Sequence, residues 1–472
     1  MADSIQEFTD SRQRIMNSSR FMSIDSCPMC RKRIRIDSKR QPNEFCAKKR
    51  YIGYNKDDRI SELPDDIVVH ILSFLTVEEA ARTSVLSSRW INLWEYTTRL
   101  KLDGDEGLAK LRRQYMFRRK LIESEERKYV RRVNRVLQSH KALTLKEFRI
   151  RFALQITDHA SITRWLQFAF SRQVERLEFD LQDDDNYHFP EKLVSTSVNF
   201  KSLRALIFTN VHVSKGPIEF FLRNCPLLEK LIVCYSANLS NLQVCGSSLA
   251  LKHLEIVYCY HLNPLTVSAP SLTYLKAATY DRLVLENMPR LVEVDVNRTD
   301  DDVSLRGLCS ALSCFSQLET LRLTLLRKEK EHNELHKLPQ LHKLKTLVVT
   351  YLLDGSETLT RLADLIRASP CLQELVVECE WKRFRRKDSE LKDAAINPHH
   401  HLKVVKFSGY RCQTSDLEFI QYILLNCLVL DKLIIKPFAS KNDTIEMEQT
   451  ARKNTKHQLE SRVPPHIELI IL

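Results

Sequence analysis

A short apolar pattern recurs along this chain from about residue 144 to its end. In each copy an apolar residue is followed by two other residues, a second apolar residue, one more residue and a third apolar residue. The last two apolar positions alternate, as in a short strand with one buried face. A single unit of this size cannot close its own core, so the copies have to stack on one another. The twelve copies are Leu145/Phe148/Ile150, Val174/Leu177/Phe179, Leu203/Leu206/Phe208, Leu228/Leu231/Val233, Leu251/Leu254/Ile256, Leu272/Leu275/Ala277, Leu291/Val294/Val296, Leu318/Leu321/Leu323, Leu344/Leu347/Val349, Leu372/Leu375/Val377, Leu402/Val405/Phe407 and Leu430/Leu433/Ile435.

The spacing of the copies identifies the kind of repeat. From Leu203 onward, successive copies begin 19 to 30 residues apart, close to the period of leucine-rich repeats, about 20 to 29 residues. We therefore predict an irregular leucine-rich-repeat horseshoe, an α/β solenoid with a concave parallel sheet. The longer units carry helical patterns around Ile218, Leu305, Leu362 and Leu417, which we expect on the convex side. The shorter units between 251 and 291 predict loops instead of helices.

Residues 57–103, ahead of the repeats, carry three short amphipathic helical patterns. Leu63-Pro64 opens the first, whose apolar stripe is Ile67, Ile71 and Leu75, with Val68 and Leu72 beside it. Thr76 and Glu79 form a capping-box pattern for the second, which includes Ala80, Val85 and Leu86. Ser87 could cap the third, anchored by Trp90, Leu93 and Trp94. A segment this small cannot bury all of its apolar side chains alone, so we expect a partner to cover some of them.

This segment resembles an F-box, from the Leu-Pro pair through the run to Leu75 and then VLSSRW and Leu93-Trp94. The resemblance implies docking on a Skp-type adaptor and, through it, on a cullin ubiquitin ligase. It also implies which positions form or support the adaptor interface. They are Leu63, Pro64, Ile67, Ile71, Leu75, Val85, Leu86 and Trp90. The alternative is a three-helix cap that is sealed on the following domain, with the stripe as ordinary core.

The last segment, residues 394–472, resembles the FBD region that follows the repeats in many plant F-box proteins. Its pieces HHHLKVVKFSGYRC, DLEFIQYILLNCLVLDKLIIKP and VPPHIELIIL fit a strand, helix, strand, helix, strand order. A final strand over 466–472 would cap the open end of the sheet. Together these resemblances predict a plant F-box/leucine-rich-repeat protein, with the F-box at 57–103, the repeats at 144–393 and the FBD-like cap at 394–472.

The composition fits a globular protein that works inside the cell. The chain has 472 residues and 43% hydrophobic content, without an apolar run long enough to span a membrane or a signal-peptide pattern at its start. We therefore expect it in the nucleus or the cytoplasm. Its 13 cysteines follow no disulfide framework, so we expect most of them to be buried thiols.

Motifs for catalysis or cofactors are missing from the sequence. Neither G-x-G-x-x-G nor a P-loop occurs, and neither H-E-x-x-H nor G-x-S-x-G is found. We expect no enzymatic activity, no catalytic residue, no bound cofactor and no metal. Cys27, Cys30 and Cys46 resemble half of a zinc knuckle, but a structural zinc needs four ligands.

Two basic segments flank the F-box. Residues 1–56 hold 13 Lys/Arg against 6 Asp/Glu, which suggests a disordered leader that could serve nuclear import. Residues 104–143 predict a basic helical connector; its positions Leu108, Leu111, Tyr115, Leu121 and Ile122 could pack on the first repeats. The chain's net charge of +13 is spread over several regions, so it is weak evidence for an acidic or nucleic-acid partner.

The sequence thus predicts a substrate-recognition adaptor of an SCF-type ubiquitin ligase, whose repeats bind an unidentified protein target. The alternative is a leucine-rich-repeat scaffold or nucleic-acid-binding module outside ubiquitination. Nucleic acid could bind the basic connector, and such binding would depend strongly on salt. The simpler interpretation is that the connector is a solvent-exposed helix. A small ligand in the horseshoe is a further possibility, for which the sequence offers no assignable polar pocket.

Overall fold

The fold comes from a computed structural model. It describes residue 60 and residues 62–472, except 105–118, 153–158, 182–186, 196–199, 247–248, 279–282, 298–311, 313–314, 326–337, 354–358, 360–361, 382–397 and 439–444. The leader that contains Cys27, Cys30 and Cys46 lies outside the described residues. Everything below belongs to one compact unit, Glu62–Leu472. None of the described helices has the length and apolar character needed to cross a bilayer.

A parallel sheet of fourteen strands organises the unit. Each strand pairs with the strand of the next repeat, which is the arrangement that stacked repeats require. The strands in spatial order are β1 (Arg99–Asp103), β2 (Glu147–Arg151), β3 (Arg176–Asp180), β4 (Ala205–Thr209), β5 (Lys230–Cys234), β7 (His253–Val257), β9 (Tyr274–Ala278), β11 (Glu293–Asn297), β12 (Thr320–Leu325), β13 (Thr346–Leu353), β14 (Glu374–Trp381), β15 (Val404–Tyr410), β16 (Lys432–Pro437) and β17 (Glu468–Ile471).

The register aligns the predicted apolar positions across the sheet. In neighbouring strands Leu177 pairs with Leu206, and Leu206 with Leu231. In every one of the twelve predicted copies the second and third apolar residues lie on a strand and are buried in a single continuous core. The predicted fold class, a short helical segment followed by a leucine-rich-repeat α/β solenoid, is confirmed.

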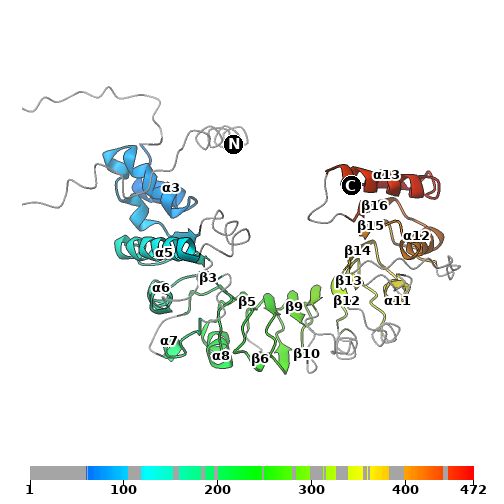
Figure 1. The fold of residues 1–472 in the computed structure, drawn as a ribbon. Helices are drawn as coiled ribbons and strands as arrows, with labels where there is room; N and C mark the ends of the chain where they lie inside the picture. The colour runs from blue at the N-terminus through cyan, green and yellow to red at the C-terminus, as the bar shows by residue number, and fades with distance from the viewer. Residues whose placement is uncertain are drawn as a thin grey trace, which may run out of the picture. The chain divides into compact units, whose positions relative to one another are not determined.

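Helices cover one face of this sheet. Figure 1 shows α6 (His159–Ser171), α8 (Lys215–Asn224), α11 (Leu362–Arg367) and α12 (Thr414–Asn426) on the same side of the strands. The short α7 (Lys192–Ser195) lies between α6 and α8 in sequence. The helices predicted around Ile218, Leu362 and Leu417 are confirmed, whereas Leu305 lies outside the described residues. We predicted no helix at α6, which buries Trp165 and Phe170.

The shorter units between 251 and 291 hold the strands β8 (Leu265–Ser268) and β10 (Leu283–Glu286) where we predicted loops, and these strands join β6 (Leu242–Cys245) of the preceding unit. Together the three strands form a second parallel sheet. Its apolar residues alternate, so that in β8 Leu265 and Val267 are buried while Thr266 and Ser268 are partly exposed. Too few residues remain in these units for a helix, and pairing between repeats satisfies the backbone hydrogen bonds instead.

The sheet begins earlier than the sequence analysis predicted. The strand β1 comes directly after the F-box-like helices and buries Leu100 and Leu102 against the first repeat. The connector forms α5 (Arg119–Ser139), whose Tyr129 hydroxyl donates to the Leu102 carbonyl at 2.5 Å. Tyr129 and Val133 are buried in the repeat core. The five packing positions predicted here, Leu108, Leu111, Tyr115, Leu121 and Ile122, lie outside the described residues or have side chains that are not described.

The C-terminal segment has the predicted order of elements. After β15 come α12, β16, α13 (Ile445–Glu460) and β17, and β17 pairs with β16 as the last strand of the sheet. Leu459 of α13 and Ile467 are buried in the same core as the repeats. This segment therefore continues the solenoid and covers its final repeat. The predicted segment boundaries themselves remain predictions.

Candidate protein-interaction site on the N-terminal helices

The F-box-like segment is built from short helical pieces. They are α2 (Asp65–Leu72), α3 (Val77–Arg82) and the 3-10 turns η3 (Thr83–Val85), η4 (Ser88–Trp90) and η5 (Leu93–Tyr96). The predicted capping box is present, since the Thr76 hydroxyl accepts from the Glu79 N–H at 3.2 Å and the Glu79 carboxylate accepts from the Thr76 N–H at 3.0 Å. Two acidic residues, Asp65 and Asp66, lie in the first turn of α2, where the helix dipole favours them.

The predicted third helix is wrong. Ser87 makes no capping hydrogen bond, and Asn92 takes a left-handed conformation with φ of 67°, which divides the segment into η4 and η5. Asparagine tolerates this conformation better than most residues. The break lets Trp90 enter the small F-box core while Trp94 contacts both that core and the repeat core. On one continuous helix the two indoles would lie on the same face.

The segment has a very small core of its own. Its buried residues are Val68, Leu72, Ala80 and Trp90, and four others pack around them: Leu63, Leu75, Leu93 and Trp94. The apolar residues of α2 thus divide into two adjacent rows. Val68 and Leu72 point inward, whereas Ile67 and Ile71 stay 42% and 40% exposed.

The strongest exposure lies in the turn after α3. Val85 is 86% exposed and Leu86 is 69% exposed. Isolated exposed apolar residues are ordinary on protein surfaces, but two large ones adjacent in a tight turn, beside a segment with a four-residue core, indicate a surface made for contact. Phe74 and Ile91 are exposed as well. These two were not predicted, although Phe74 follows Ile71 at helical spacing and could have been found from it.

The structure separates the eight predicted interface positions into three groups. Exposed are Pro64, Ile67, Ile71, Val85 and Leu86; Leu63 and Leu75 are half-buried against the small core; Trp90 is buried. Trp90 can therefore support an interface but not form its surface. Arg89 fastens this arrangement, because its guanidinium bonds to Asp65 at 2.9 Å and to the Leu63 carbonyl. Contact of these positions with an adaptor remains a prediction.

The segment is joined firmly to the repeats. Val77 of α3 belongs to the repeat core, and the Ser73 hydroxyl accepts from the Thr98 N–H at 3.1 Å. Glu78 forms an ion pair with Arg132 of α5 at 3.2 Å, and Glu95 forms one at 2.6 Å with Lys141, just after the end of α5. Both contacts link the F-box segment to the connector. A partner held by the F-box segment would therefore have a defined position relative to the first repeats.

The exposed face of the main sheet changes in character along the repeats. On β1–β3 it carries cross-strand ion pairs, including Arg149 with Asp103 and Arg151 with Glu178 at 2.9 Å. Further along, Tyr235 and Tyr258 lie beyond the C-terminal ends of β5 and β7, where they stack at 4.5 Å, both with positive φ, which is rare for bulky residues. Exposed Tyr260 lies two residues beyond. Tyrosine is enriched at protein-binding hot spots.

Four cysteines of the repeats do not have the chemistry of nucleophiles. Burial raises the pKa of Cys225, Cys234 and Cys427 to about 12 and that of Cys259 to about 11. These thiols stay protonated at neutral pH, whereas a nucleophilic cysteine needs a lowered pKa. Within the described part of the chain, no group of three or more His, Cys, Asp or Glu side chains could hold a metal ion.

A small helical interaction module fused to a leucine-rich-repeat solenoid defines the class of F-box/leucine-rich-repeat proteins. Comparison with protein families agrees: the F-box domain model matches residues 60–101, and the model described as At1g61320/AtMIF1, LRR domain, matches residues 196–469. The second match covers more than half of the chain. The chain therefore belongs to this leucine-rich-repeat family and carries an F-box.

Several curated proteins of Arabidopsis thaliana are similar along much of the chain. The FBD-associated F-box protein At3g52670 is 30% identical over 51% of this chain and 60% of its own length. The putative F-box/FBD/LRR-repeat protein At4g13965 is 27% identical over 84% of this chain and 94% of its own length. The chain thus spans about three fifths of the first relative and nearly all of the second. The names of these relatives, F-box, FBD and LRR-repeat, agree with the two family models.

Proposed function

We propose that this protein is a substrate-recognition subunit of an SCF-type cullin ubiquitin ligase. In this role the F-box segment docks on a Skp-type adaptor, and the repeats hold a target protein. The observation that carries the proposal is the exposure of Val85 and Leu86, together with Ile67 and Ile71, around a core of only four buried residues. A domain that was sealed against its own repeats would bury these side chains.

The contribution of such a subunit is positional. Tethering a target near a conjugating enzyme raises its effective concentration, so that no side chain of this chain needs to form or break a bond. The protonated cysteines fit this role. The fastening of β1 and α5 to the F-box segment supports it too, because a rigid link keeps the target at a fixed distance.

For the target we propose the exposed face of the main sheet. Beside this face, just past the C-terminal ends of the middle strands, lie the stacked pair Tyr235 and Tyr258 and the exposed Tyr260, which supply large contact area at a low entropic cost. The ion-paired strands β1–β3 offer fewer free groups, since their arginines already bind carboxylates of neighbouring strands. We further propose that the protein acts in the nucleus, the cytoplasm or both.

The test is co-purification with a Skp-type adaptor. Burying two such side chains contributes roughly 3 kcal/mol, which is more than about a hundredfold in Kd. The double variant Val85→Asp/Leu86→Asp should therefore lose the adaptor. The matched control is Leu428→Asp/Val429→Asp, a second adjacent pair of exposed apolar residues, located in the C-terminal segment. Undiminished capture by the first variant would refute the proposed docking surface.

A further inference from the structure

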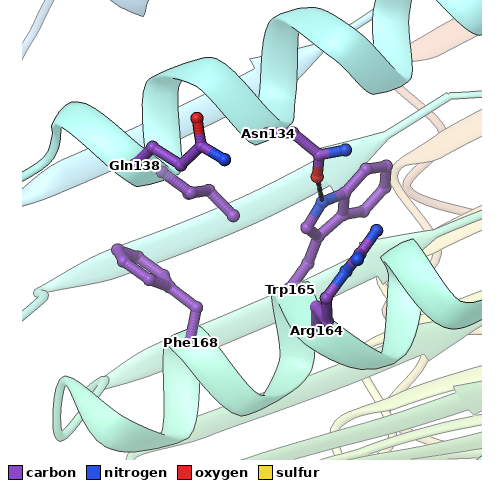
Figure 2. Close-up of a pocket in the computed structure, with 6 residues that line it drawn as sticks. Asn134, Gln138, Arg164, Trp165 and Phe168 are labelled. Atoms are coloured by element: carbon purple, nitrogen blue, oxygen red, sulfur yellow. Dashed lines mark hydrogen bonds between the residues drawn. The ribbon is translucent and has the colours of Figure 1, made fainter.

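A cavity of about 270 Å³ opens between α5 and α6, on the helical side of the first repeats. Figure 2 shows Asn134 and Gln138 on one helix facing Arg164, Trp165 and Phe168 on the other. Leu137 completes the lining. None of these residues belongs to the F-box segment or to the exposed strand face, so the cavity has no part in the function proposed above.

The cavity has fixed walls. The Trp165 indole N–H donates to the Asn134 side-chain oxygen at 2.8 Å, which ties α6 to α5 (Figure 2). The Phe168 ring contacts the His140 ring with centroids 5.8 Å apart, and the Arg172 guanidinium lies over the Phe168 ring at 5.2 Å. A wall that is already ordered loses little entropy when a ligand binds.

The size of the cavity limits how large a bound group can be. Sites for whole cofactors or drug-sized ligands occupy about 300–1,000 Å³, and this cavity lies just below that range. Leu137, Trp165 and Phe168 supply its apolar lining, whereas the lining residues Gln138 and Arg164 are exposed. One large apolar side chain fits this arrangement, with polar or charged neighbours outside.

The helix α5, which forms one wall of the cavity, is basic, and Arg164 lines the opposite wall. Arg131, Asn134, Arg135 and Gln138 follow one another at spacings of three, one and three residues, so they share one face of α5. From 127 to 146 the sequence contains no Asp or Glu. Arg127 and Lys128 pair with acids of the preceding turn. Among the described residues, no carboxylate pairs with Arg131, Arg135 or Arg164.

We propose that this cavity is a second docking site, which receives one large apolar side chain from an acidic segment of a partner protein. The apolar anchor fills the space between α5 and α6, and neighbouring carboxylates of the partner meet Arg164 and the arginines of α5. Such a buried anchor with a polar surround is the usual form of a binding hot spot. The complementary charge steers the partner to the site and makes binding sensitive to salt.

A nucleic acid is the less suitable occupant of this basic surface. Single-stranded RNA and DNA bind through bases that stack on exposed aromatic faces. Trp165 is buried, and Arg172 already covers one face of the Phe168 ring. The residues that line the cavity therefore leave at most one face of the Phe168 ring on which a base could stack.

The probe is a fluorescein-labelled peptide, Glu-Asp-Glu-Phe-Asp-Glu-Asp, titrated with the full chain and followed by fluorescence anisotropy. We expect a Kd below about 1 mM at low salt. Replacing the central Phe by Ala should weaken binding at least about tenfold. Equal binding of the Phe and Ala peptides, or no binding up to about 1 mM, would overturn the proposal.

Two variants and two matched controls locate the site. Gln138→Trp places an indole at the opening of the cavity, and Arg164→Glu reverses the charge beside it. Each substitution should raise the Kd of the Phe peptide at least about tenfold. Gln167→Trp introduces the same indole on the exposed side of α6, and Arg127→Glu reverses a more distant charge. Both control variants should bind the Phe peptide nearly as tightly as the unmodified chain does. Unchanged binding by Gln138→Trp and Arg164→Glu would contradict the site.

Competition distinguishes the two kinds of partner. A single-stranded oligouridine RNA should not displace the Phe peptide at moderate salt, because the arginines of α5 and Arg164 offer it only phosphate contacts. If the RNA displaces the peptide, and if its own binding is blocked by Gln138→Trp, then the cavity serves nucleic acid and the proposed acidic protein partner is wrong.

Discussion

The F-box segment and the repeats differ in how they bury their apolar side chains. The repeats share one continuous core that extends from Val77 to Ile467, because every strand is covered by the next. The F-box segment has a separate core of only four buried residues and leaves Val85 and Leu86 in solvent. The comparison teaches that the two parts differ in how much apolar surface they bury: the described repeats bury theirs against one another, whereas the described F-box segment leaves several large apolar side chains exposed.

The largest expected effect comes from removing the one aromatic side chain of the small core. Trp90→Ala leaves a cavity among Val68, Leu72 and Ala80 and should lower the stability of the F-box segment by about 3–5 kcal/mol. The repeats should stay folded, because their core does not include Trp90. Limited proteolysis followed by mass spectrometry measures this: cleavage should begin within residues 62–98 and spare the strands.

A cooperative collapse of the whole chain in the Trp90→Ala variant would show that the two parts are not energetically separate. Phe208→Ala, which opens a cavity of comparable kind in the repeat core, is the control, and there proteolysis should begin in the repeats.

Two neighbouring residues of α2 sharpen the same comparison. Leu72→Ala removes a buried side chain and should lower stability by about 2–5 kcal/mol. Ile71→Ala removes a 40% exposed one and should change stability by less than about 1 kcal/mol, yet weaken binding to a Skp-type adaptor about tenfold. Thermal unfolding and calorimetric titration measure the two effects separately. A large loss of stability in Ile71→Ala, with unchanged affinity, would assign Ile71 to the core.

The smallest effect concerns pH at the junction of the two parts. The His140 imidazole donates from Nε2 to the Thr97 carbonyl at 2.8 Å, and burial lowers the pKa of His140 below its usual range, with Arg172 adding to the shift. The folded state therefore prefers neutral His140. Its contribution to stability is present above the unfolded pKa of about 6.5 and is lost as the pH falls through the lower folded value.

We therefore expect the melting temperature to fall between about pH 7 and pH 5, and to fall less in His140→Gln, which cannot be protonated. His400→Gln, an exposed histidine, is the control and should follow the unmodified chain. If His140→Gln shows the same pH dependence as the unmodified chain, protonation of His140 does not weaken the junction.

The repeats were predictable because their signal is local and repeated. Each copy places its second and third apolar residues two apart, and each became a buried pair on a strand. The second sheet was missed, although Leu242/Val244, Leu265/Val267 and Leu283/Leu285 show the same alternation, because we expected loops in units too short for helices. The strand β1 was missed because its residues were read as the end of the F-box.

The candidate site was predictable only in part. Helical spacing places the apolar residues Ile67, Val68, Ile71 and Leu72 on one face of a helix. It cannot say which of them are buried, because this depends on where Trp90 packs. The left-handed Asn92 that turns Trp90 inward is likewise a tertiary outcome, because asparagine tolerates that conformation without requiring it.

Hydrogen–deuterium exchange of the chain alone and with a Skp-type adaptor tests the central claim most directly. If the F-box segment is the part left for a partner to cover, adding the adaptor should slow exchange in peptides that span residues 63–75 and 83–91, and leave the strands from β4 to β16 unchanged. Unaltered exchange in those two segments, or protection confined to the repeats, would contradict the account.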